Sequence, residues 1–156
     1  MTRALMKMGR SEAEARAVAA TADGSIGRAL DLSAGDFVET RDVAVSVLVR
    51  AASGGNRLDA AKDLVAKATG TSAEARERLA ACLRAMASLL RDVALVATGG
   101  HQDALANADV KPALDRLGAF QGDRGLRAFA AVDRALVALD RSASVKIVAD
   151  WLVLQL

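Results

Sequence analysis

The sequence predicts an all-α protein, a helical bundle preceded by a smaller helical piece. Hydrophobic residues make up 53% of the 156 residues, aromatic residues make up only 3%, and alanine and leucine dominate. This composition favours helices and provides little material for sheets. Apolar residues also recur at helical spacing through most of the chain. A chain of this length suits one domain or a small module attached to a larger protein.

The charges and the scarce residue types narrow the range of functions. The chain carries 21 Lys and Arg against 19 Asp and Glu, scattered rather than in blocks, so we expect no general electrostatic attraction to DNA. Cys82 is the only cysteine and His101 the only histidine, which predicts no internal disulfide and no zinc site. The chain has no apolar run typical of a signal peptide or a membrane span. We therefore expect a soluble, cytoplasmic protein without a membrane partner.

The first helices are predicted from their start signals. Ser11 and Glu14 have the spacing of a capping box, which predicts a helix over residues 12–21. Ser25 is placed to cap a second helix, in which apolar residues recur at helical spacing. Gly35 is expected to break the chain, and an acidic start signal follows it.

The middle of the chain holds the one segment where a strand competes with a helix. Val43, Val45 and Val47 alternate, and β-branched residues favour sheets. A lone strand has no partner here, so we predict a buried helix that ends before "SGGN". Asn56 is expected to cap the next helix, Gly70 to follow its end in the left-handed conformation, and one apolar stripe to contain Leu58, Ala61, Leu64, Val65 and Ala68.

The longest predicted helix opens at Ser72 and runs over residues 73–97. It carries two apolar seams, a pattern typical of a helix that is buried centrally or shared between neighbours. The first seam contains Leu79, Leu83, Met86, Leu90 and Val93, and the second contains Cys82, Leu89 and Val96.

An irregular connection and three further helices complete the prediction. The stretch "TGGHQDALANADVKPAL" holds a glycine pair and the only proline, so we expect it to be mostly irregular. Helices are expected over residues 111–117 and 125–140, and Ser144 is placed to cap the last one, "VKIVADWLVLQL". One face of the helix over 125–140 is expected to hold Phe129, Val132, Leu136 and Leu139.

The residue types that carry catalysis do not form recognisable sets. The lysines have no glycine frame of the phosphate-loop type, so nucleotide hydrolysis by this chain alone is not expected. His101 follows two glycines but has no companion base or ligand, and Cys82 lies on a helix seam where a thiol usually acts as a small apolar filler. We therefore assign no catalytic, cofactor-binding or metal-binding residue.

Several residues have both a functional and a structural interpretation. Arg91 and Asp92 interrupt an apolar run and need partners, for which an ion pair with a neighbouring helix is favoured over contact with another subunit. Trp151 and Leu152 are either an exposed site for a partner or part of the core. Three arginines interleaved with acids indicate a solvated helix face, without the aromatic residues that stack on single-stranded DNA, namely Arg76, Arg78 and Arg84.

The stretch "ADGSIGRALDL" raises a separate question, because its glycines and serine precede an arginine and a helix. Backbone N–H groups at a helix start attract anions, so the stretch is either a phosphate-binding turn or only a helix start. Patterns this short also arise by chance.

Four segments, taken in order, are similar to a known family. "EAEARAVAATADGSIGRALDL", "LLRDVALVATGG", "ALANADV" and "LDRSASVKIVADWLVLQL" together resemble the C-terminal part of the delta-prime subunit of bacterial DNA polymerase III, a component of the sliding-clamp loader. The similarity spans nearly the whole chain. Each motif alone is weak, but the ordered set is fairly specific.

The resemblance implies a division of the chain and a set of partners. Residues 1–34 correspond to the end of a helical AAA+ lid, and residues 35–156 correspond to a helical collar domain that joins the collars of other loader subunits in a ring of five. The family's AAA+ module, with its zinc-binding cysteines, lies outside this sequence, so we expect a piece of a longer protein.

The resemblance also implies a function without chemistry of its own. The chain is expected to act within a DNA-directed DNA polymerase holoenzyme, with no cofactor or small-molecule ligand. It is expected to meet the sliding clamp and primed DNA only through the whole complex.

The family comparison bears on Arg28. The lid helix of ATP-binding loader subunits has a Gly-Ser-x-Arg pattern whose arginine reaches the phosphates, and Gly27 stands at that position here. Arg28 lies one residue later, about 100° further round a helix, which disfavours a phosphate contact. The alternative is the lid and collar of an ATP-binding loader subunit, with Arg28 on the phosphate. A helical DNA-binding module, which would bind with a steep salt dependence, is a third and weaker hypothesis.

Overall fold

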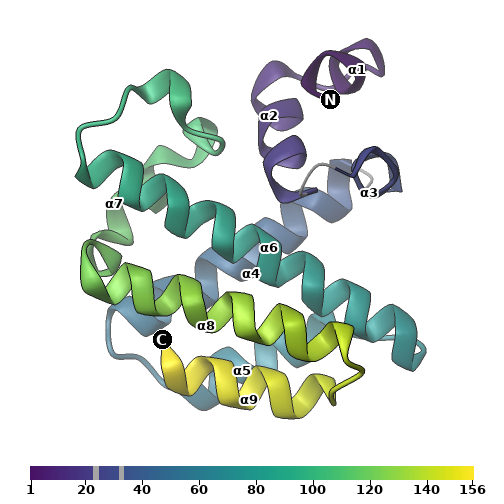
Figure 1. The fold of residues 1–156 in the computed structure, drawn as a ribbon, viewed down its shortest axis with the longest axis vertical. Helices are drawn as coiled ribbons and strands as arrows, with labels where there is room; N and C mark the ends of the chain where they lie inside the picture. The colour runs from purple at the N-terminus through teal and green to yellow at the C-terminus, as the bar shows by residue number, and fades with distance from the viewer. Residues whose placement is uncertain (23–24, 32–33) are drawn as a thin grey trace.

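The prediction of an all-α protein is confirmed. The computed structural model describes residues 1–22, 25–31 and 34–156, without the side chains of residues 28, 30, 31 and 34. These described residues form α-helices and short 3₁₀ helices and no strand (Figure 1). The elements are α1 (Thr2–Lys7), α2 (Glu12–Thr21), α3 (Ile26–Asp31), α4 (Ala34–Ala52), α5 (Arg57–Lys67), α6 (Ser72–Ala97), η1 (Gln102–Ala104), η2 (Ala108–Val110), α7 (Lys111–Arg116), η3 (Gly118–Phe120), α8 (Asp123–Asp140) and α9 (Val145–Gln155).

The main hydrophobic core surrounds α6. In Figure 1, α6 crosses the molecule with α4 behind it and α8 beside it, while α5 and α9 lie below. The first predicted seam of α6 is buried throughout, and Cys82 and Leu89 of the second seam are also fully buried. This burial on two sides confirms that α6 is the central helix of the bundle.

A second, smaller hydrophobic cluster lies in the N-terminal part. It is built from α1, α2, α3 and the start of α4, with Leu5, Val18 and Phe37 as its largest buried side chains. Phe37 belongs to this cluster, whereas Ala44 on the same helix belongs to the main core. Helix α4 therefore joins the two clusters, and the predicted domain boundary falls at its first residue.

Side-chain caps explain why several helices begin where they do. The Ser11 hydroxyl accepts a hydrogen bond from the Glu14 amide at 3.2 Å, and the Glu14 carboxylate accepts one from the Ser11 amide at 3.1 Å. This capping box confirms the predicted start of α2, and the helix ends at Thr21, as predicted. The Asn56 side chain accepts from the amide of Leu58 at 3.0 Å, which confirms the predicted start of α5.

Other helix starts differ from the prediction. Gly35 does not break the chain but lies in the first turn of α4. The valine-rich segment of the same helix is helical, as predicted. Thr71 rather than Ser72 caps α6, since its hydroxyl accepts from the Glu74 amide at 3.4 Å and its own amide donates to the Glu74 carboxylate at 2.8 Å. The Thr71 amide and the Thr71 hydroxyl, the latter at 2.9 Å, both donate to the Glu74 carboxylate, and these two hydrogen bonds lower the pKa of Glu74.

Two further differences concern α1 and α9. The sequence does not predict α1 as a separate helix, whereas Thr2–Lys7 is helical in the structure. Ser144 is the N-cap residue of α9, but its side chain makes no capping hydrogen bond. The apolar pattern of "VKIVADWLVLQL", rather than its cap, is therefore the signal that locates α9.

Three residues assigned to apolar stripes are instead exposed. Leu58 is 65% exposed, Phe129 44% and Val96 38%. Leu58 lies in the first turn of α5 and Val96 in the last turn of α6. Helical spacing places a residue on a face, but it does not say whether a neighbouring helix extends far enough to cover that residue.

Candidate functional site

Asp92 is the best-defined polar centre of the molecule. It lies on α6, is fully buried, and accepts hydrogen bonds from the backbone amides of Ala106 at 3.2 Å and Asn107 at 2.7 Å. The Asn107 side-chain amide donates to the same carboxylate at 2.9 Å and to the Ser88 hydroxyl at 3.0 Å. Three N–H groups converge on one carboxylate, so Asp92 fixes the position of the irregular connection that follows α6.

The predicted ion pair of Asp92 with a neighbouring helix is wrong. Among the residues that the structure describes, no cation lies within ion-pair distance of Asp92, and amide N–H groups compensate its burial instead. Arg91, the preceding residue, is exposed and lines a groove between α6 and α8. The two neighbouring charges therefore have different roles, one inside the bundle and one on its surface.

Two arginines also hold the irregular connection in place. Arg41 of α4, only 5% exposed, forms a two-pronged ion pair with Asp109 at 3.0 and 2.7 Å and lies over the Phe37 ring at 5.2 Å. Arg16 of α2 donates to the carbonyl oxygen of Asp103 at 3.0 Å. Sequence reasoning missed both contacts, because the partners lie 68 and 87 residues apart and no local pattern signals them.

His101 and Cys82 do not lie together. His101 is exposed in the loop before η1, whereas Cys82 is fully buried in the main core. Burial raises the pKa of the Cys82 thiol to about 11, so the thiolate form is suppressed at neutral pH. This environment agrees with the prediction that Cys82 packs as a small apolar side chain.

Trp151 and Leu152 have different environments. Leu152 is fully buried, and Trp151 is half-buried against the main core. On the outer side of α9, Ile147 is 68% exposed and Leu154 is 59% exposed, and both have helical spacing with Trp151. We call Ile147, Trp151 and Leu154 the α9 stripe. The carbonyl oxygen of Leu154 accepts from the Arg57 guanidinium at 3.0 Å, which places the exposed Leu58 near the end of this stripe.

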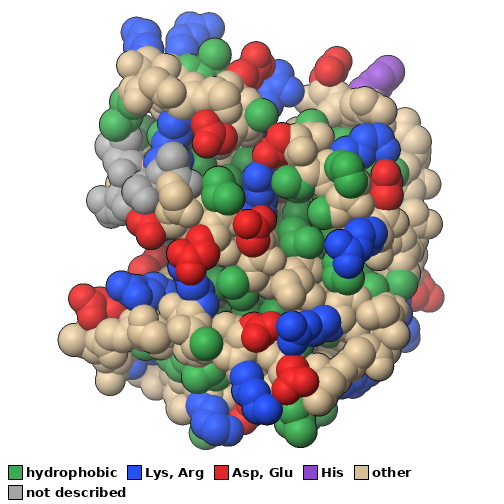
Figure 2. Space-filling view, turned by 180° about the vertical axis from the view of Figure 1, so that it is seen from behind, with side chains coloured by type: hydrophobic (Ala, Val, Ile, Leu, Met, Phe, Trp, Pro, Cys, Tyr) green, Lys and Arg blue, Asp and Glu red, His purple; other side chains and the backbone are tan. Residues whose placement is uncertain are grey.

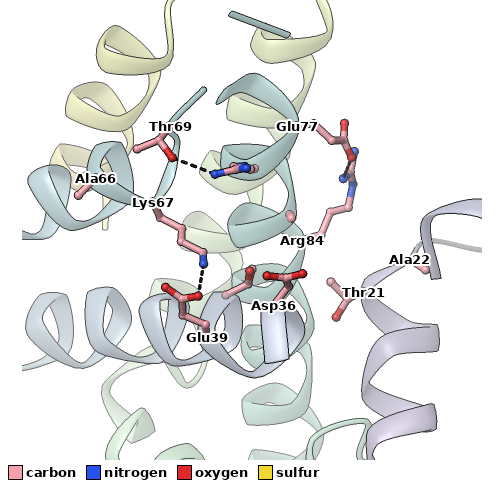
Figure 3. A pocket seen from close by; sticks show the side chains of 12 residues that line it. Thr21, Ala22, Asp36, Glu39, Ala66, Lys67, Thr69, Glu77 and Arg84 are labelled. Atoms are coloured by element: carbon pink, nitrogen blue, oxygen red, sulfur yellow. Dashed lines mark hydrogen bonds and ion pairs between the residues drawn. The ribbon is translucent and has the colours of Figure 1, made fainter. Parts of the chain in front are cut away.

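A cleft of about 660 Å³ separates α2 and the start of α4 from α5 and α6. Four of its charged side chains form ion pairs, Lys67 with Glu39 at 2.6 Å and Arg84 with Glu77 at 3.0 Å, while Arg78 donates to the neutral Thr69 hydroxyl at 2.9 Å (Figure 3). The face seen in Figure 2 likewise mixes both signs of charge. The charged side chains that line the cleft are balanced in sign, so the cleft presents no excess of either charge.

The predicted solvated arginine face on α6 holds only in part. Arg78 is exposed, but the Arg84 side chain is just 14% exposed because it lies in the cleft beside Glu77. In "ADGSIGRALDL", Gly27 is an exposed residue of α3. The side chain of Arg28, on which the phosphate hypothesis depends, lies outside the described residues.

Residues 1–22, 25–31 and 34–156 contain neither a metal-binding cluster nor a helix able to span a membrane. Within them, no group of three or more His, Cys, Asp or Glu side chains gathers as a metal site requires. No described helix combines the length and the apolar character needed to cross a membrane.

Comparisons with family models, with curated proteins and with solved structures found no match to this chain.

Proposed function

We propose that this chain is an assembly module, the collar part of a clamp-loader subunit of the delta-prime type, with residues 1–34 as the end of a lid. In this proposal the chain performs no chemistry. It joins the other loader subunits in the cytoplasm as part of a DNA polymerase III holoenzyme. It meets the sliding clamp and primed DNA only through the complete complex.

The observation that carries the proposal is the exposed apolar surface on α9. Ile147 and Leu154 are more than half exposed, Trp151 lies between them on the same face, and Leu58 of α5 is 65% exposed nearby. Large apolar side chains grouped around a tryptophan are typical of the buried centre of a protein interface. Removing them from water stabilises association by roughly 25 cal/mol per Å² of apolar surface.

The contacts between the motifs that carry the resemblance also support the proposal. Asp92, from "LLRDVALVATGG", binds Asn107, from "ALANADV", through both the backbone and the side chain of Asn107. Asp109, also from "ALANADV", pairs with Arg41 of α4. Two of the four segments that resemble the family are therefore joined by specific hydrogen bonds, and one of these two is also anchored to α4.

The arrangement of the two hydrophobic clusters is consistent with the proposed lid and collar. The smaller cluster involves residues up to Phe37, and the larger one begins with Ala44. Two cores joined by one helix fit two structural units better than one, because each unit needs its own buried apolar set.

Assembly with purified loader subunits tests the proposal. The chain is mixed with the remaining subunits of a bacterial clamp loader, and its incorporation is measured by sedimentation velocity. We expect it to enter the complex, and we expect Ile147→Asp/Leu154→Asp to weaken entry by at least about tenfold, since buried charges at an interface centre cost more than about 1.4 kcal/mol.

Met8→Asp is the matched control, because Met8 is 63% exposed but lies in the N-terminal part, away from α9. We expect this variant to assemble like the unaltered chain. Failure of the unaltered chain to join or compete for the complex would contradict the proposal. Equal incorporation of the α9 variant would exclude the α9 stripe as the contact surface.

A further inference from the structure

A surface distinct from the α9 stripe lies between α6 and α8 and carries unpaired charges. It is a groove of about 430 Å³, which Ala20 and Thr21 of α2 also line. Its apolar lining combines the small Ala87 of α6 with larger side chains of α8, of which Phe129 is 44% exposed and Val137 is 42% exposed. The groove thus has a small residue on one wall and protruding apolar residues on the other.

The two walls carry opposite charges. Arg91 projects from the α6 wall, and Asp133 and Asp140 project from the α8 wall. All three are exposed, and no described residue forms an ion pair or hydrogen bond with any of them. In the cleft beside α2, by contrast, Lys67 pairs with Glu39 and Arg84 pairs with Glu77.

We propose that this groove is the contact surface for a second copy of the chain. Helices α6 and α8 run antiparallel beside each other (Figure 1). A twofold axis along the groove places the α6 wall of one copy on the α8 wall of the other, so that Arg91 meets the partner's Asp133. An axis across the groove would instead place α6 on α6, with like charges opposed. The distribution of charge therefore selects one arrangement.

The shapes of the walls agree with the same arrangement. When α8 of one copy faces α6 of the other with Arg91 on Asp133, the small Ala87, one turn from Arg91, comes opposite Val137, one turn from Asp133, and the contact occurs twice by symmetry. Large side chains opposite small ones interdigitate, as packed cores require. This inference does not depend on the proposed loader function, because it uses α6 and α8 rather than the α9 stripe.

Charge reversal tests the second copy directly. Sedimentation equilibrium over about 1–200 μM, a range that spans weak protein–protein affinities, is expected to show a reversible monomer–dimer equilibrium. Arg91→Glu alone and Asp133→Arg alone should each weaken dimerisation by about tenfold or more, because each places like charges together twice. An equimolar mixture of the two variants should recover a dimer, since one of its two symmetric contacts keeps the native charges and the other has both reversed.

Arg127→Glu, an equal charge change at an exposed α8 residue that does not line the groove, is the control and should leave dimerisation unchanged. Circular dichroism of every variant monitors folding. A chain that stays monomeric over the whole range overturns the inference, as does a mixture that fails to recover a dimer. Association of the monomer only with another loader subunit through this groove also overturns it.

Discussion

Replacement of Asp92 by alanine removes the acceptor for three buried N–H groups. Those hydrogen bonds measure 3.2, 2.7 and 2.9 Å and involve the Ala106 amide and both nitrogens of Asn107. Bonds to a charged group contribute about 1.5–3 kcal/mol each. Removal of the carboxylate also relieves its own desolvation penalty of several kcal/mol. We therefore expect a net loss of about 2–4 kcal/mol in the free energy of unfolding.

Urea unfolding followed by circular dichroism measures this loss, with Asp133→Asn as the control. Asp133 is exposed and has no ion-pair partner among the described residues, so its change should stay within about 0.5 kcal/mol at concentrations where the chain is monomeric. The loss of stability in Asp92→Asn, which keeps one acceptor oxygen, should lie between the losses in Asp92→Ala and Asp133→Asn. Hydrogen exchange should become faster at the amides of residues 106 and 107. A loss below about 0.5 kcal/mol for Asp92→Ala, a size ordinary for surface changes, would refute the role of Asp92.

Three further predictions concern a glycine, a cap and the thiol. A Cβ at position 125 would overlap the Phe120 carbonyl oxygen, so Gly125→Ala should lower stability by more than about 2 kcal/mol, whereas Gly27→Ala on open α3 should be neutral or stabilising in thermal unfolding; equal effects would contradict this. Thr71→Ala should cost about 1 kcal/mol and raise the pKa of Glu74 part of the way to its ordinary value, measured by NMR titration, because the hydroxyl hydrogen bond is lost while the larger contribution of the Thr71 amide remains; an unmoved pKa would exclude the hydroxyl as a cause. Burial raises the pKa of Cys82 to about 11, above the value near 9 of an exposed thiol in the unfolded chain. The folded state should therefore lose stability as the pH rises from about 9 to about 11, because only the unfolded chain deprotonates there. This loss should be smaller in Cys82→Ala, and equal pH profiles of the two proteins would contradict it.

The helices whose starts depend on local chemistry could be predicted from the sequence. The Ser11 and Glu14 capping box determines the start of α2 to the residue, because its hydrogen bonds join atoms only three residues apart. Thr71 was missed because Ser72 is an equally good cap type, and only the backbone shows which of the two lies outside the helix. Local signals therefore located the elements but left adjacent candidates unresolved.

The partners of the buried polar residues could not be predicted in the same way. The need of Asp92 for a partner follows from its place in an apolar run, but its partners are amides of an irregular connection 14 and 15 residues away. Helical periodicity also does not predict which apolar residues near a helix end are buried, as the exposed Leu58 shows. The sequence indicates Trp151 and Leu152 as candidates for an exposed site. Trp151 belongs to the α9 stripe, whereas Leu152 beside it is part of the core.

Hydroxyl-radical footprinting of the chain within a reconstituted clamp loader tests the assembly proposal most directly. Trp151 reacts readily with hydroxyl radicals, and Leu154 beside it is 59% exposed in the free chain. We expect oxidation of both to fall on assembly, while oxidation of Met8, which is 63% exposed in the N-terminal part, stays unchanged. An assembled complex in which Trp151 and Leu154 remain as reactive as in the free chain would contradict the account.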